Sequence, residues 1–376
     1  MGQFRGVELD DVELAGKRLL LRRWRPADAE PLHAIMQDPS LREFLSLPDP
    51  YTRDEARRWV EQFGQVGRAG GSGLGCAVVE QSSGRLVGSA ALQLTGDPEI
   101  GYWMAPAARG AGYAAEVART LCSWGFSLGL PRIRLGCHVR NLASARTALA
   151  AGFRFEGVSR NGLISGGVRS LPELRGDLAR FGRLADDPPG RVPYAFVPLP
   201  EAGLSDGVIQ LRTMRGPDAA EVAETDDELT LRWSFSGVPH TADEVRQMAE
   251  QAGLQWLVGT VAVFAMVDVA SGRVAGSLRL RLAGPPQVGG IGYVVHPSFR
   301  GRGYASRALR LLVPWAFEAA DFARLELGAK LGNEASLRAA AGAGFTPDGI
   351  RRCRLRNPDG TFSDEQRYAL TNPNYG

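Results

Sequence analysis

The stretch from Glu99 to Leu128 most constrains the fold, because it predicts a strand, a glycine-rich turn and a helix in direct succession. The strand reads Glu-Ile-Gly-Tyr-Trp-Met, and the turn contains Gly110 and Gly112. Apolar side chains then recur at helical spacing, at Val117, Leu121, Trp124 and Leu128. Such a unit suits phosphate binding, since unpaired N–H groups and the helix dipole attract an anion at the start of the helix.

The same unit occurs again 191 residues further along, where Ile291-Gly-Tyr-Val-Val-His-Pro precedes Ser-Phe-Arg300-Gly301-Arg-Gly303. Other landmarks keep nearly the same offset of 190 to 192 residues: Arg25 with Arg215, Asn141 with Asn333, Ser144 with Ser336, and Gly152 with Gly344. A constant offset over ordered landmarks indicates a duplicated domain rather than a short solenoid repeat.

The pattern Arg-x-x-Gly-x-Ala after a strand, with Asn-x-x-Ser and Ala-Gly-Phe downstream, resembles the GNAT acyltransferase superfamily. Within it, both halves are most similar to the RimJ/RimL-like ribosomal-protein N-acetyltransferases. The resemblance implies an α+β fold of two tandem GNAT domains, each a mixed, mostly antiparallel sheet flanked by helices. We expect the domains at 1–185 and 207–376, joined by a proline-rich linker at 186–206 that is semi-rigid.

The resemblance also implies the cofactor, acetyl-CoA or another acyl-CoA, and the residues that hold it. Backbone amides of the two turns would bind its pyrophosphate, at Arg109, Gly110, Gly112, Tyr113 and Ala114, and at Arg300, Gly301, Gly303, Tyr304 and Ala305. Backbone N–H groups near Trp103 and Met104, or near Val294 and Val295, would polarise the thioester carbonyl. The family's pantetheine arm would lie beside Asn141 and Asn333, with Ser336 matching Ser144 near the sulfur.

Two catalytic candidates follow: Glu99 as the base that receives the amine proton, and Ser144 as the acid that protonates the leaving thiolate. Plainer interpretations are a solvent-facing carboxylate for Glu99, and for Asn141 and Ser144 a helix N-cap with a polar first turn. Gly290 stands in the second half where Glu99 stands in the first. Glu326 lies on the following strand, and the same offset matches it to Leu135, not to Glu99.

Composition limits the function classes. The net charge of +3 is small for 376 residues, so we expect no nucleic-acid partner, and no apolar run has the length of a membrane span. The four cysteines and four histidines show no metal-ligand spacing, so no metal is assigned. Cys137 and His138 are adjacent on a predicted strand, where side chains point to opposite faces, which disfavours a Cys–His nucleophile. We expect reduced, mostly buried thiols in a cytoplasmic protein.

The leading functional hypothesis is acyl transfer from acyl-CoA to a primary amine by direct attack, with a peptide or protein α-amine as acceptor. One alternative is a biosynthetic or resistance acyltransferase acting on a small amine metabolite or antibiotic. Another is an acyl-CoA-binding sensor or scaffold with one or both halves inactive. Because only the first half keeps a strand carboxylate, we expect it to do the chemistry. The halves should form an internal pseudo-dimer, in a chain that is a monomer or homodimer.

Three local expectations concern glycine and proline. The glycines of 64–75 predict a loop, those of 162–176 predict a mobile segment between the last two strands, and Pro314 predicts a kink in the second glycine-led helix.

Overall fold

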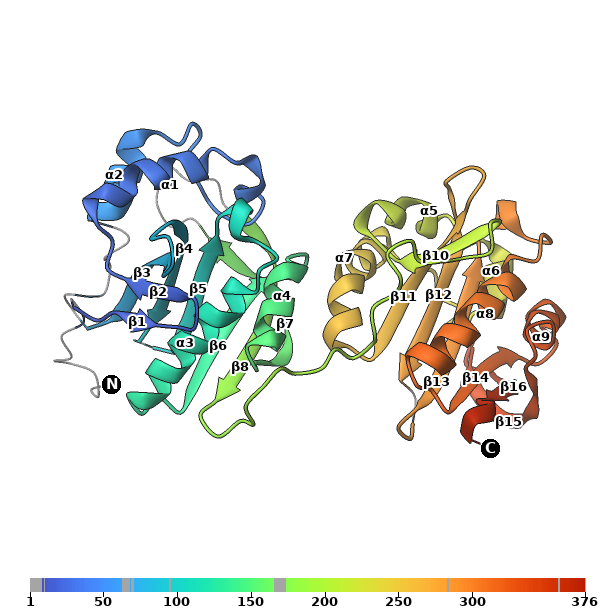
Figure 1. The fold of residues 1–376 in the computed structure, drawn as a ribbon. Helices are drawn as coiled ribbons and strands as arrows, with labels where there is room; N and C mark the ends of the chain where they lie inside the picture. The colour runs from blue at the N-terminus through green and yellow to red at the C-terminus, as the bar shows by residue number, and fades with distance from the viewer. Residues whose placement is uncertain are drawn as a thin grey trace. The chain divides into compact units, whose positions relative to one another are not determined.

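The computed structural model describes residues 9, 11–62, 68, 71–94, 96–165, 174–282, 284–357 and 359–375. The chain divides into two compact units, Met1–Pro193 and Tyr194–Gly376 (Figure 1). The division falls inside the proline-rich stretch. Residues that follow it belong to the second unit, because the Phe196 side chain is fully buried there and its ring packs against that of Trp256.

The first unit is a mixed sheet with helices on both faces. Its strands pair in the order β1-β2-β3-β4-β5-β6-β8-β7, and every neighbouring pair is antiparallel except β5 and β6. The elements follow the chain as β1 (Leu14–Ala15), β2 (Leu19–Arg22), α1 (Ala29–Met36), α2 (Arg53–Glu61), β3 (Gly73–Glu80), β4 (Leu86–Gln93), β5 (Glu99–Met104), α3 (Tyr113–Ser127), β6 (Arg132–His138), α4 (Leu142–Ala150), β7 (Arg154–Ser165) and β8 (Leu174–Leu184).

The second unit repeats this plan with a sheet in the order β15-β16-β14-β13-β12-β11-β10-β9, where only β13 and β14 are parallel. Its elements are β9 (Leu204–Ser205), β10 (Ile209–Thr213), α5 (Ala219–Ala223), α6 (Glu228–Trp233), α7 (Ala242–Val258), β11 (Val261–Asp268), β12 (Val274–Leu282), β13 (Val288–Val295), α8 (Tyr304–Pro314), β14 (Arg324–Lys330), α9 (Glu334–Ala341), β15 (Thr346–Arg356) and β16 (Phe362–Thr371). The predicted α+β class and tandem arrangement are confirmed.

Each sheet is covered on two faces by different helices. In the first unit, α1 and α2 pack on one face, where Leu32 and Val60 share a buried cluster with Val79 of β3. Helix α3 packs on the other face, where Gly125 lies against the side chains of Leu92 and Ile133. We call the face under α1 and α2, and the corresponding face under α5 and α7, the acceptor face of each half.

The same arginine–aspartate ion pair lies near the start of both halves. Asp28 accepts hydrogen bonds from Arg22 Nη1 and Nη2 at 2.8 Å and from the Arg25 backbone N–H. Asp218 makes the matching bonds to Arg212 and to the Arg215 N–H. The ion pair connects β2 to the start of α1 in the first half and β10 to the start of α5 in the second.

Two glycine-rich segments contain more strand than predicted. Strand β3 begins at Gly73, inside the segment predicted as a loop. Strand β7 reaches Ser165 and β8 begins at Leu174, so both ends of 162–176 are paired. The register shifts between Ser159 and Leu163, and an irregularity of this kind accommodates glycine within a strand. Residues 166–173, with 63–67 and 69–70, lie outside the described part of the chain.

Pro314 ends helix α8, and a π-helix follows at Trp315–Ala319. Because proline has no N–H to donate, the regular hydrogen-bond ladder is interrupted there. The predicted kink at Pro314 stays a prediction, and what the structure shows at this residue is a change from α-helix to π-helix.

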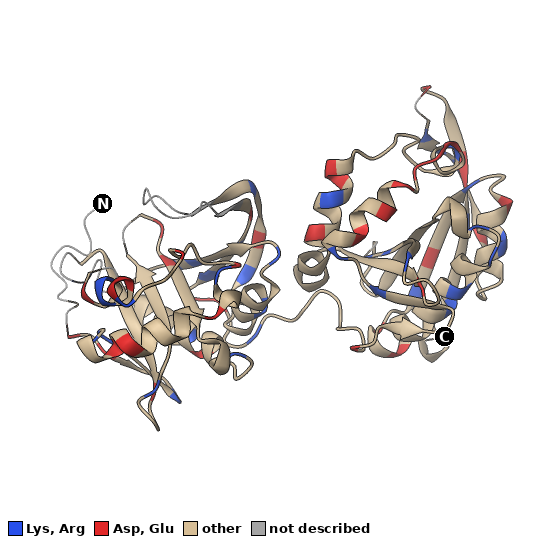
Figure 2. Cartoon of the chain, turned by 90° about the horizontal axis from the view of Figure 1, so that it is seen from above, with Lys and Arg blue, Asp and Glu red and all other residues tan. Residues whose placement is uncertain are grey.

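Charged side chains of both signs lie on both units (Figure 2). None of the helices in the described residues combines the length and apolar character that crossing a bilayer requires.

Candidate active sites

The one parallel strand pair in each sheet separates part-way along its length. Strands β5 and β6 pair only at Glu99–Arg134 and Ile100–Leu135, after which β5 continues to Met104 without a partner on that side. Strands β13 and β14 pair as far as Ile291–Leu327 and separate at the same relative position. Each half therefore has a gap in its sheet, edged by unpaired backbone groups that an extended ligand can bind.

Hydrogen-bond alternation identifies which amides face each gap. The Ala105 N–H bonds to Val87 of β4 and the His296 N–H bonds to Ala275 of β12. Alternate residues of an antiparallel strand point to opposite edges. The N–H groups of Trp103 and Val294 therefore point to β4 and β12, whereas those of Met104 and Val295 face the gap. Of the four predicted carbonyl-polarising residues, Met104 and Val295 have the required orientation, and the amides of Tyr102 and Tyr293 share it.

A glycine N-cap begins the helix beyond each gap. Gly112 precedes α3 and Gly303 precedes α8, with φ angles of 75° and 76°, and no side chain caps either helix. Helices α2, α4, α6, α7 and α9 all have side-chain caps. A Cβ added at Gly110 or Gly301 would meet no atom within 4 Å. The first-turn amides thus face open space, which suits an incoming phosphate.

The arginine side chains of the two turns hold protein groups instead of reaching into open space. Arg300 forms a bidentate pair with Asp227 at 2.7 Å and donates to the Thr230 hydroxyl. This guanidinium keeps the pKa of the Asp227 carboxyl well below its usual range. Arg109 donates to the Ser40 hydroxyl at 2.9 Å. The backbone N–H groups of Arg109 and Arg300 donate to the Pro106 and Pro297 carbonyls. The phosphate contacts predicted for the turn amides would therefore come from the residues that follow, with the arginine side chains bracing the turn.

Replacing Asp227 with Asn should weaken coenzyme A binding by the second half about 10-fold, or ~1.4 kcal/mol. Asparagine caps a helix as well as aspartate does, so α6 should persist while the bidentate charge pair is lost. Asp226→Asn is the matched control, since Asp226 binds His240 on the same loop. Calorimetric titration with coenzyme A should separate the two variants, and equal affinities would contradict this role for Asp227.

The Asn-x-x-Ser landmarks are helix caps whose amide NH₂ groups remain available. Asn141 Oδ1 accepts from the Ser144 N–H at 3.0 Å, and Asn333 Oδ1 accepts from the Ser336 N–H at 3.2 Å. In the described part of the chain, neither asparagine Nδ2 has a partner. The plain capping interpretation is correct for both residues, and it leaves the Nδ2 donors free to bind a ligand.

A tyrosine that we did not predict joins each serine. Tyr102 of β5 lies with its hydroxyl 3.0 Å from Ser144 Oγ, and Tyr293 of β13 lies 2.9 Å from Ser336 Oγ. Burial raises the pKa of Tyr102, against the opposing effect of the Ser144 hydrogen bond. Tyr293 is shifted in the same direction for the same reason. Each half thus holds a protonated phenol–hydroxyl pair beside its gap.

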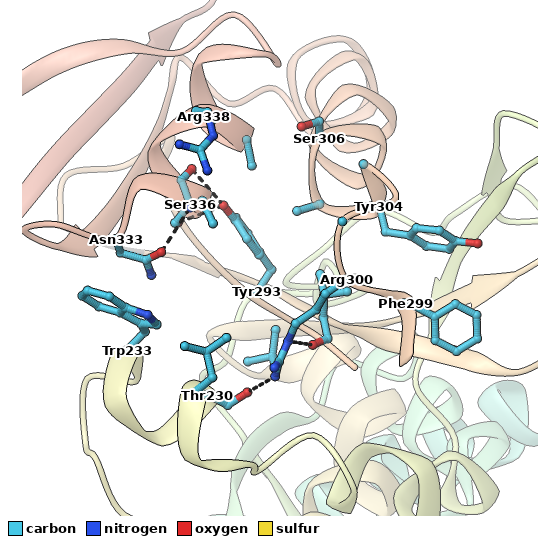
Figure 3. A pocket seen from close by; sticks show the side chains of 18 of the residues that line it. Thr230, Trp233, Tyr293, Phe299, Arg300, Tyr304, Ser306, Asn333, Ser336 and Arg338 are labelled. Atoms are coloured by element: carbon cyan, nitrogen blue, oxygen red, sulfur yellow. Dashed lines mark hydrogen bonds between the residues drawn. The ribbon is translucent and has the colours of Figure 1, made fainter. Parts of the chain in front are cut away.

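In the second half these parts line one pocket of about 480 Å³ (Figure 3). In Figure 3 the Tyr293 hydroxyl points to Ser336, Asn333 lies next to Trp233, and Arg300 reaches toward Thr230. Every predicted cofactor residue of this half lines the pocket: Val294, Val295, Arg300, Gly301, Gly303, Tyr304, Ala305, Asn333 and Ser336. The volume is that of a typical ligand site.

Glu99 lies on the acceptor face where β5 and β6 begin to separate. Its carboxylate forms an ion pair with Arg134 at 3.2 Å and lies over Gly136, with 39% of the side chain exposed. Next to it, Gly101 is exposed, and a Cβ added there would meet no atom within 4 Å. An acceptor therefore has room to approach the strand beside a carboxylate.

The sheet register corrects our match for Glu326. Glu99 pairs with Arg134 and Gly290 pairs with Glu326, so Glu326 occupies the place of Arg134, not of Leu135. The offset had already changed from 191 to 192 residues before this strand. Burial works against ionisation of Glu326, but hydrogen bonds from Arg324 and Arg367 lower its pKa overall. It serves as an ion-pair partner beside the site.

Among the remaining sequence candidates, the Cys137 thiol lies beside Ser144 but is kept in its protonated form by burial. Cys76, Cys122 and Cys137 are buried free thiols, Cys353 is exposed, and burial raises the pKa of Cys137 to about 12. His138 Nδ1 accepts from the Arg140 N–H. Within the described ranges no cluster of His, Cys, Asp and Glu side chains could hold a metal ion.

Comparison with known proteins identifies the family of this chain. The family description "Acetyltransferase (GNAT) domain" matches residues 18–154 and again 209–346. The chain belongs to the GNAT acetyltransferase family. The uncharacterized N-acetyltransferase YoaA of Bacillus subtilis (strain 168) is 30% identical over 156 residues, which are 40% of this chain and 88% of that protein.

Solved structures of GNAT proteins also match about half of this chain. The ribosomal-protein-S5-alanine acetyltransferase from Vibrio fischeri is 20% identical, with 45% of this chain and 95% of that chain covered and a TM-score of 0.41. RimL, a ribosomal L7/L12 α-N-protein acetyltransferase in complex with coenzyme A, is also 20% identical. The match covers 45% of this chain and 97% of that chain, with a TM-score of 0.40.

GNAT proteins use acyl-CoA, and this chain is an N-acetyltransferase of that family with two such domains. The residues present fit that donor. The glycine-capped helices would receive its pyrophosphate, the sheet gaps its pantetheine arm, and the Asn141 and Asn333 amides would hydrogen-bond along that arm.

Proposed function

We propose that the chain transfers an acetyl group from acetyl-CoA to a primary amine, with a peptide or protein α-amine as acceptor. The observation that carries this proposal is the separation of the parallel strands directly before a glycine-capped helix, in both halves. The preference for a peptide or protein acceptor rests on the RimJ/RimL-like motifs. The exposed Gly101 beside Glu99 supports it, since it leaves room for another backbone.

Acetyl-CoA supplies a thioester whose acyl carbon accepts the amine. Glu99 takes a proton from the acceptor's ammonium group, and Arg134 holds that carboxylate in place. The Met104 amide donates to the thioester oxygen, where negative charge develops. The Tyr102–Ser144 pair delivers a proton to the departing sulfur.

The test is a screen for release of free coenzyme A from acetyl-CoA and longer acyl-CoAs. The acceptor panel holds peptides with free N-termini, the same peptides N-terminally blocked but carrying lysine, and small amines. We expect release with free N-terminal peptides and a mass increase at the α-amine. Turnover with small amines alone would favour the metabolite or antibiotic alternative. Coenzyme A binding without turnover on any acceptor would favour the sensor alternative.

Changing Tyr102 and Tyr293 together to Phe should lower kcat about 100-fold, because the leaving sulfur loses its proton donor. The raised pKa of Tyr102 keeps its phenol protonated above pH 10, the ordinary midpoint for tyrosine. The loss should therefore be constant from pH 7 to pH 9. The double variant Ser144→Ala with Ser336→Ala should lower kcat by a similar factor. Combining the serine and tyrosine substitutions should lower kcat little further, as expected when both residues act in one network. Fully additive losses in kcat would contradict a shared relay.

A further inference from the structure

A carboxylate covers the same glycine position in both halves. Gly136 and Gly328 are the first residues of β6 and β14 beyond the last parallel pair. Glu99 Oε1 lies 3.2 Å from the position that a Cβ would take on Gly136. Over Gly328 lies the side chain of Glu365, with its Cγ 3.1 Å from the corresponding position and its carboxylate nearer still.

The two carboxylates reach this position from different strands. Glu99 comes from β5, whereas Glu365 comes from β16, where it pairs with Lys330 of β14. The first-half counterpart of that pair is His138 with Leu178 of β8, and Leu178 also lies against Gly136. The second half thus has Gly290 in place of Glu99, and Glu365 in place of Leu178. A carboxylate therefore lies over the equivalent glycine in both halves, from β5 in the first half and from β16 in the second.

The surroundings of Glu365 are unusual for a structural carboxylate. The residue is 7% exposed, and its Oε2 atom is buried without a hydrogen bond in the described part of the chain. The nearest cations are Arg351 Nη1 at 3.7 Å and Arg354 Nε at 3.9 Å from Oε2. Lys330 donates to the Arg232 carbonyl instead. A buried carboxylate oxygen without a hydrogen bond is costly, so its presence calls for an explanation beyond packing.

We propose that the C-terminal half is a second acyl-transfer centre, in which Glu365 is the base that deprotonates a primary amine acceptor. This inference rests on the proposed function. Glu365 takes one proton from the ammonium group, the nitrogen forms a C–N bond to the acyl carbon, and the C–S bond breaks. The Tyr293–Ser336 pair protonates the thiolate and recovers the second nitrogen proton. The products are the amide, free coenzyme A and one proton released from Glu365 to water.

The first arm of the test silences the N-terminal half with Gly110→Asp, which places a carboxylate in its phosphate turn. The acceptor panel is then screened on this full-length variant with acetyl-CoA. We expect turnover to persist on at least one primary amine. The proposal of a second centre would be overturned if the wild-type chain is active and the Gly110→Asp variant still binds coenzyme A but transfers no acyl group. No transfer by the wild-type chain would instead count against the proposed function itself.

The second arm adds Glu365→Gln to the Gly110→Asp chain. We expect kcat to fall about 10²- to 10⁴-fold with coenzyme A affinity unchanged. The loss should shrink as pH rises, because the amine then deprotonates in water, and Glu365→Asp should restore part of the rate. Glu326→Gln is the matched control, since Glu326 is a paired carboxylate on the same face. A pH-independent loss in Glu365→Gln, or a larger loss in Glu326→Gln, would overturn the role of Glu365.

Discussion

In a chain whose second half is silenced by Gly301→Asp, replacing Glu99 with Gln should lower kcat by about 10²- to 10⁴-fold. Glutamine keeps the shape of the side chain but cannot accept the amine proton. The KM for acetyl-CoA should change little, because Glu99 lies on the acceptor face, away from the glycine turn. The difference in kcat between Glu99→Gln and the parent chain should shrink as pH rises, because the acceptor amine then loses its proton to water.

Asp97→Asn is the control for this prediction. Asp97 binds the same arginine, with Arg134 Nη1 at 2.8 Å from its Oδ2, but 73% of its side chain is exposed and it precedes the strand. It should therefore leave kcat near the wild-type value. If Asp97→Asn and Glu99→Gln lower kcat equally, the carboxylates act by placing Arg134 and neither is the base.

The second large effect concerns the glycine turns. Gly110→Asp and Gly301→Asp should each weaken coenzyme A binding in their own half by about 100-fold, or ~2.8 kcal/mol. Both glycines have φ angles near 75°, a conformation that Asp and Asn adopt more readily than most residues. The added carboxylate would lie where the pyrophosphate should bind and would repel it.

Gly110→Asn and Gly301→Asn are the matched controls, since they carry nearly the same backbone strain without the charge. Their affinity for coenzyme A should stay within about 5-fold of wild type, a cost below ~1 kcal/mol. Titrations at low and high salt add a second check, because charge repulsion is screened by salt and backbone strain is not. Equal losses in the Asp and Asn variants would show that the turn does not bind an anion.

Features that depend on neighbours along the chain were predictable from the sequence. The strand, turn and helix at Gly110 and Gly112 form a local unit, and the caps at Asn141 and Asn333 lie within three residues of their partners. The fixed offset between the halves made each such feature visible twice. The fold class therefore followed from a handful of short motifs.

Features that depend on sheet register were not predictable. Glu326 was matched by a constant offset, but one inserted residue before β14 moves it to the place of Arg134. Glu365 is 75 residues from Gly290, and only the pairing of β14 with β16 brings it over Gly328. Tyr102 and Tyr293 share the offset of 191 residues and could have been noticed, but their serine partners lie on a different element.

The role of the turn arginines was also hidden in the sequence. The Arg300 side chain binds Asp227, the N-cap residue of α6, and Thr230 in the first turn of that helix. These residues are about 70 positions away and belong to no recognisable motif. We expect backbone amides to bind the phosphate, and what the motifs did not indicate is that the arginine side chains bind protein groups.

Calorimetric titration of the full-length chain with coenzyme A tests the central claim, two complete acyl-CoA sites in one chain, most directly. We expect a stoichiometry of about two for the wild-type chain. For Gly110→Asp or Gly301→Asp we expect about one, when the coenzyme A concentrations are high enough to fill the unaltered half but too low to fill the altered one. A stoichiometry of one in the wild-type chain, unchanged by Gly301→Asp, would contradict that claim.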